Sequence, residues 1–183
     1  MPWTIDKAHT RIGFSVKHMM VSTVHGEFKS YSGTIELDAQ DLTRSRVSGE
    51  IEVASIDTGN SDRDNHLRAN DFFDAPNHPT ISFRSTRLER LSSDTFKVFG
   101  DLTIRGVTRE VELEAEYAGQ HKNPWGKTST GFTVTGTINR KDFGMDFNMP
   151  LETGGLLVGE KVKIQLDIEA VLEEAPVAAA AAN

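Results

Sequence analysis

Hydrophobic and polar residues alternate along most of the chain with a period of two, which is typical of half-buried β-strands. In residues 11–18, every second side chain from Ile12 onward falls on one face, and that face is apolar apart from His18. In residues 108–118, four glutamates alternate with apolar residues. The same pattern predicts further strands at residues 23–38, 46–55, 80–91, 95–105, 127–139 and 161–172.

The alternation stops between the third and fourth predicted strands. Residues 61–69 have helical spacing, and Asn60 or Ser61 is suited to cap a short helix there. Phe72 and Phe73 follow, between two aspartates. Every barrel must close its ends, so one interpretation is a connection that only covers the core. The alternative is a lid that seals or gates a cavity.

About eight antiparallel strands, each polar outside and apolar inside, form either a sandwich or a closed barrel. Short connections between consecutive strands favour an up-and-down barrel, which leaves no exposed edges. Small residues fall on the inner face at Gly49, Gly100, Ala115 and Gly136. They indicate an internal space, although glycine also occurs where a barrel strand bends.

Strands of about 12 residues would make a bore roughly 30 Å deep, which suits a long apolar chain better than a compact metabolite. The predicted lining consists of inward strand positions, the aromatic pair of the lid, and Phe143 from the irregular stretch that follows residue 139. These residues are Phe14, Val16, His18, Val53, Phe83, Val98, Phe132, Val134, Gly136 and Phe143, with Phe72 and Phe73.

Length, charge and amino-acid composition exclude several classes of function. The chain has 183 residues, which fits one domain over residues 1–173 and a disordered alanine-rich tail over residues 174–183. A net charge of −7 argues against nucleic-acid binding, and the absence of cysteine excludes disulfides and thiolate metal sites. No run is long enough for a membrane span, and no signal peptide precedes the first strand. We therefore expect a cytoplasmic protein, or a periplasmic one if a leader has been removed.

Four segments resemble the YceI family of polyisoprenoid-binding proteins. They are residues 3–14 with His18 beyond them, residues 64–74, residues 100–109 and residues 136–144. The resemblance extends from Trp3 to Val171. It implies an all-β fold, an extended eight-stranded antiparallel lipocalin-like β-barrel with a short helical lid segment.

The resemblance also implies that the barrel binds a long-chain isoprenoid, a quinone-like compound or another amphiphilic lipid, with no catalysis and no other cofactor. It favours the leaderless cytoplasmic kind of family member and allows a homodimer. The family supplies no catalytic residues that could be transferred to this chain.

Polar residues leave a second interpretation open. Six histidines are present, but none stands in a spacing typical of metal ligands, so we predict no metal site. His18 points inward at a strand end and is placed to meet a lipid head group. Arg68 and Arg140 are candidate head-group donors, unless Arg68 forms a structural ion pair with Asp64 or Asp71 and Arg140 one with Asp142. The alternative function is an enzyme or metal-binding protein that uses His18 and neighbouring histidines on a lipophilic substrate.

Overall fold

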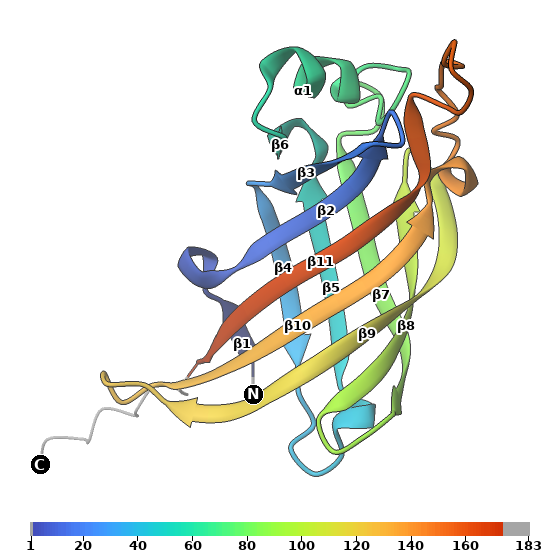
Figure 1. The fold of residues 1–183 in the computed structure, drawn as a ribbon. Helices are drawn as coiled ribbons and strands as arrows, with labels where there is room; N and C mark the ends of the chain where they lie inside the picture. The colour runs from blue at the N-terminus through green and yellow to red at the C-terminus, as the bar shows by residue number, and fades with distance from the viewer. Residues whose placement is uncertain (1, 174–183) are drawn as a thin grey trace, which may run out of the picture.

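The chain folds into a closed antiparallel β-barrel with one short helix across one end (Figure 1). The computed structural model describes residues 2–173, so the predicted tail lies outside the described residues. The strands are β1 (Pro2–Ile5), β2 (Arg11–His18), β3 (Ser22–Phe28), β4 (Tyr31–Glu36), β5 (Arg46–Glu52), β6 (Ile56–Asp57), β7 (Thr80–Arg90), β8 (Thr95–Ile104), β9 (Val107–Lys122), β10 (Thr128–Asn139) and β11 (Val158–Leu172).

Strand β11 closes the barrel. On one side it pairs with β10 along its length, and on the other it pairs first with β2 and then with β1. Strand β1 in turn pairs with β4, which completes a ring with β5, β7, β8, β9, β10 and β11. Strands β2, β3 and β6 extend the wall at the helical end, where β3 pairs with both of the others (Figure 1).

The predicted all-β fold with an eight-stranded barrel is confirmed, although two predicted strands differ in detail and one short strand at the start of the chain was not predicted. The chain at 23–38 forms two strands, β3 and β4, separated at residues 29–30. The strand predicted at 46–55 ends at Glu52, where the 3-10 helix η3 (Val53–Ser55) begins. A short strand, β1, precedes β2 and is joined to it by the 3-10 helix η1 (Lys7–His9).

The helix α1 (Ser61–Arg68) forms where helical spacing predicted it. Its N-cap is Asn60, whose side-chain oxygen accepts a hydrogen bond from the backbone N–H of Arg63. Asp64 is buried and accepts hydrogen bonds from the backbone N–H and hydroxyl of Thr58, which fixes the helix to the end of β6. Within the described part of the chain, no helix is long and apolar enough to cross a membrane.

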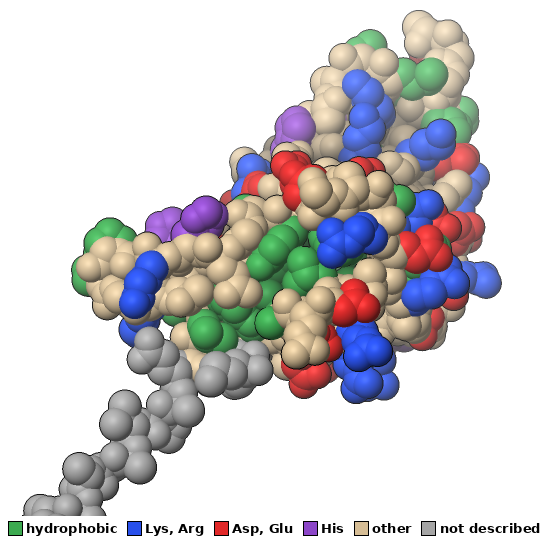
Figure 2. All heavy atoms as spheres, turned by 90° about the horizontal axis from the view of Figure 1, so that it is seen from below, with side chains coloured by type: hydrophobic (Ala, Val, Ile, Leu, Met, Phe, Trp, Pro, Cys, Tyr) green, Lys and Arg blue, Asp and Glu red, His purple; other side chains and the backbone are tan. Residues whose placement is uncertain are grey.

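Buried side chains gather at successive levels of the barrel rather than in one solid core. One cluster, which includes Phe28, Ile56 and Phe143, lies under the helical end. A second is built on Val98 and Leu113, and a third on Trp3 and Ile35. Seen from the end opposite α1, hydrophobic side chains show in the middle of the face, and most of the charged side chains lie to one side (Figure 2).

Candidate functional site

The barrel encloses a cavity of about 780 Å³. Every strand of the ring contributes inward side chains, and the wall is mostly aliphatic and aromatic. This volume is within the range of about 300–1,000 Å³ typical of small-molecule sites. Of the predicted lining, the structure places on this wall Phe14, Val16, His18, Phe72, Phe73, Phe83 and Arg140.

Inward glycines contribute to the cavity in two different ways. Gly49 leaves real space, because the nearest atom to a Cβ added there would be the Ser32 carbonyl oxygen at 3.3 Å. Gly100 is instead covered by the ring of Phe83, and Gly136 by Leu113, whose Cδ2 would lie 2.5 Å from the added Cβ. At these two positions, the space that a side chain would occupy is filled by a larger side chain of the neighbouring strand.

A second cavity of about 110 Å³ lies next to the first, farther from α1. The predicted lining residues Val98, Phe132 and Val134 belong to this smaller cavity and not to the larger one. The bore is therefore divided, rather than continuous as the strand lengths had indicated. Six side chains border both cavities: Ile35, Val47, Phe83, Leu113, Leu166 and Ile168.

Two predicted lining residues are buried behind the wall. Val53 and Phe143 are each 1% exposed and pack in the cluster under the helical end. Both lie in 3-10 helices. The period-two alternation used to predict the direction of Val53 therefore no longer holds, and Phe143 lies beyond the end of its predicted strand. Gly136 does not border the cavity itself, because the side chain of Leu113 lies over it.

One face of α1 forms part of the cavity wall. Arg63, His66 and Leu67 lie three and four residues apart, so they share that face. Arg68 lies on another face, and its guanidinium donates to the carbonyl oxygens of Ala54 at 2.9 Å and Ile56 at 3.1 Å. Arg68 does not border the cavity, and Arg63 is the cation of the helix that does.

The lid is fastened to the rest of the barrel by aromatic contacts. The rings of His66, Phe72 and Phe147 form a mutual cluster with centroids 4.9–5.3 Å apart. His66 Nε2 also lies 2.9 Å from a carboxylate oxygen of Asp71. The segment between η4 (Arg140–Phe143) and β11 thus packs against the lid, and Phe147 and Met149 from that segment line the cavity.

Arg140 is a buried cation at the same end of the cavity. It is 2% exposed, and its guanidinium donates to the carbonyl oxygens of Gly159 at 2.8 Å, Met145 at 2.6 Å and Val158 at 3.3 Å. Burial lowers the pKa of Arg140. The ion pair with Asp142 considered from the sequence does not form; backbone carbonyls hold the guanidinium instead.

Several wall residues were missed by the sequence analysis. Ile12, Val24 and Ile51 lie in phase with predicted lining positions, so a stricter use of the alternation would have found them. Phe147 and Met149 stand in a segment that the sequence analysis treated as irregular. Phe143, Met145, Phe147 and Met149 nevertheless alternate there with a period of two, which is a signal that could have found them.

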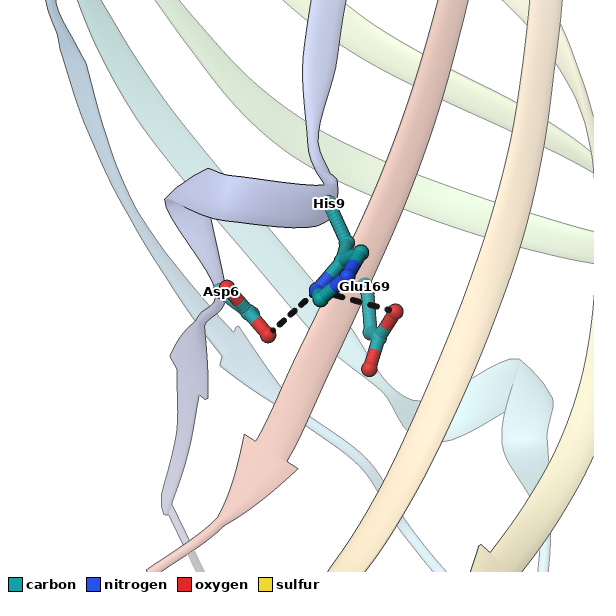
Figure 3. Close-up of side chains that lie close together, drawn as sticks. All are labelled: Asp6, His9 and Glu169. Atoms are coloured by element: carbon teal, nitrogen blue, oxygen red, sulfur yellow. Dashed lines mark hydrogen bonds and ion pairs between the residues drawn. The ribbon is translucent and has the colours of Figure 1, made fainter. Parts of the chain in front are cut away.

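One cluster of residues has the chemistry of a metal site, but it lies away from the cavity. His9 Nδ1 is 2.9 Å from Asp6 Oδ2 and 3.8 Å from Glu169 Oε2 (Figure 3). Asp6 caps η1 by accepting the Ala8 N–H, and its hydrogen bond to His9 raises the pKa of that imidazole. None of the three lines either cavity, and His18 is not among them. The arrangement is explained as a structural link between η1 and β11.

Comparison with known proteins agrees with this architecture. A family model described as a YceI-like domain matches residues 3–170. A UPF0312 protein of Staphylococcus epidermidis is 42% identical over 168 residues, covering 91% of this chain and 95% of that protein.

Solved structures give the same result. The YCEI protein of Campylobacter jejuni is 36% identical with a TM-score of 0.75, covering 93% of this chain and 98% of that one. A domain from Saccharophagus degradans named as polyisoprenoid-binding shares the fold, with a TM-score of 0.65 at 14% identity, covering 95% of this chain and 98% of its own.

Proposed function

The chain belongs to the YceI-like family, and on this premise we propose that its barrel binds one long-chain amphiphilic lipid, such as an isoprenoid or an isoprenoid quinone, and carries or stores it without chemical change. The observation that carries the proposal is the cavity of about 780 Å³ with its mostly apolar wall. Burying an apolar chain there would contribute about 0.8 kcal/mol for each methylene, less the cost of ordering the chain.

The wall also favours one direction for such a ligand. All the basic residues that border the cavity come from the end of β2, α1 and η4; they are Lys17, His18, Arg63, His66 and Arg140. These elements lie together at one end of the barrel (Figure 1). Other polar residues, such as Ser48, Glu50 and Ser82, border it from β5 and β7. Deeper in the bore the inward side chains are Phe83, Leu113 and similar apolar groups. We therefore place the head group at the α1 end and the tail toward Phe83.

The Saccharophagus degradans domain is named as polyisoprenoid-binding, which agrees with the proposed class of ligand. At 14% identity the likeness shows the fold alone, so the ligand class rests on the cavity. Of the polar groups in the wall, Arg63 donates to the side-chain and backbone oxygens of Thr58, and His66 is bonded to Asp71.

The proposal is tested by titration of delipidated protein. The chain is unfolded, extracted with organic solvent and refolded, and a fluorescent polyene fatty acid is bound as a reporter. An isoprenoid quinone with a long side chain is expected to displace the reporter saturably with a stoichiometry of about one, because each buried carbon adds to its affinity. The same quinone head without its chain should not displace it. Displacement by the head alone, or no saturable binding, would overturn the proposal.

A further inference from the structure

Two side chains that separate the larger cavity from the smaller one each lie over a glycine of the next strand. Phe83 on β7 and Leu113 on β9 border both cavities. Each rests on an inward glycine of the neighbouring strand, Phe83 over Gly100 and Leu113 over Gly136. In both cases a Cβ on the glycine would overlap the larger side chain, so the glycine is required for that side chain to lie where it does.

Neither side chain is forced across the bore by the backbone. Strand β8 pairs regularly with β9 through this level, with Val98 opposite Leu113 and Gly100 opposite Val111. Strand β7 has its register shift beyond Phe83, between Ser85 and Arg87. The partition thus depends on side-chain shape at a few positions rather than on a closed end of the sheet.

We propose that Phe83 and Leu113, seated on Gly100 and Gly136, form an internal floor that sets the maximum length of the apolar chain bound in the larger cavity. The proposal rests on the proposed lipid-binding function and specifies it further. A chain that enters from the α1 end meets the floor after filling the cavity of about 780 Å³, and the cavity of about 110 Å³ beyond stays outside its reach. Chain length, more than head-group chemistry, would then be the property for which this barrel selects.

The test measures dissociation constants for a series of isoprenoid quinones with one head and increasing numbers of isoprene units. Each additional buried methylene is worth about a fourfold change in Kd. For the natural chain, Kd should fall with length up to a break and then stop falling or rise. Phe83→Ala and Leu113→Ala join the two cavities, so the break should move to a longer homologue, with a gain of at least about tenfold for the first homologue beyond the natural break.

Phe14→Ala is the matched control. Phe14 also lies over an inward glycine, Gly26, and lines the larger cavity, but it does not border the smaller one. Its truncation widens the cavity without opening the floor, so the break should stay at the same length. If Phe83→Ala does not fold, Phe83→Leu gives the same comparison with a smaller loss of packing.

Gly136→Ala tests the seat itself. The added methyl group displaces the flexible end of Leu113, and the nearest backbone atom, the Glu112 carbonyl oxygen, stays at 3.4 Å. Leu113 then projects farther into the bore, and the break should move to a shorter homologue.

The possible results separate the floor from the function on which it rests. If the natural chain binds no homologue of any length, the proposed function fails. If it binds them but the break is absent, stays fixed in the floor variants, or moves equally in Phe14→Ala, the floor is refuted while lipid binding stands.

Discussion

Gly49 offers the most direct way to fill the cavity without disturbing the fold. It lies in the middle of β5, paired with Gly33 on β4 and Phe83 on β7, and the space above it is open. In Gly49→Phe the new Cβ has one tight contact, 3.3 Å to the Ser32 carbonyl oxygen, which a shift of a few tenths of an ångström relieves. Phenylalanine is also favoured over glycine in strands, so the variant should fold with a thermal midpoint close to that of the natural chain.

The effect on binding follows from the volume that the ring occupies. A benzyl side chain adds about seven carbons to the cavity and displaces a similar number of ligand carbons. At about 0.8 kcal/mol each, the upper bound on the loss is roughly 6 kcal/mol, which corresponds to about four orders of magnitude in Kd. Because a flexible chain can partly withdraw from the ring, we expect a loss of at least about a hundredfold.

The assay is displacement of the fluorescent fatty acid by a long-chain isoprenoid quinone, with Gly131→Phe as the matched control. Gly131 lies on β10 opposite Glu169, lines neither cavity, and has only ordinary contacts around an added Cβ, the nearest being Ala118 Cβ at 3.6 Å. This control should bind as the natural chain does. Unchanged affinity in a folded Gly49→Phe variant would show that the ligand does not occupy this cavity.

Three further results are expected. Arg140→Met removes three hydrogen bonds to backbone carbonyls and should lower the free energy of unfolding by about 3 kcal/mol in denaturant titrations; a loss below about 1 kcal/mol would contradict the buried network. Arg105 Nη1 donates hydrogen bonds to the backbone carbonyl oxygens of Asn70 and Phe72 in the lid, at 2.5 and 2.8 Å. Arg105→Met removes both bonds, so bound lipid should dissociate about tenfold faster in stopped-flow displacement. An unchanged dissociation rate would show that Arg105 does not hold the lid in place. Asp6 raises the pKa of His9, so the contribution of His9 to stability is present below its ordinary value of 6.5 and is lost as the pH rises through the raised value. The difference in thermal midpoint between the natural chain and His9→Gln should therefore shrink from about pH 6 to about pH 9, and a constant difference would contradict the pairing.

The alternation of side chains was sufficient to predict most of the strands, whereas the choice of a barrel over a sandwich came from the short connections and the family resemblance. Strands such as β9 have a solvated face of glutamates and an inner face from Val111 to Tyr117, and the inward residues line the cavities as that phase requires. The helical lid was also readable, because spacing and capping are local properties. The rule fails where the chain leaves the sheet, as at Val53, which lies in a 3-10 helix and packs into the core. Phe143 also lies in a 3-10 helix, where the sequence offered no strand phase to predict its direction.

The interior could be predicted only in part. Glycines on the inner face indicated a space, but a glycine looks the same in a sequence whether it stands open, as Gly49 does, or lies under a ring, as Gly100 does. The difference depends on which side chain leans across from the next strand, and that is a property of tertiary packing. The division of the bore and the position of Arg63, rather than Arg68, at the cavity wall also depend on tertiary packing.

The central claim is that the barrel carries a chain-like lipid in its bore, and native mass spectrometry of the purified protein tests it most directly. The account predicts an added mass of one long-chain amphiphile on a major fraction of the molecules, released by organic solvent and restored when an isoprenoid quinone is supplied. Gly49→Phe should have little of this added mass, whereas Gly131→Phe should retain it. A natural chain that has no added mass and takes up none from excess quinone would contradict the account.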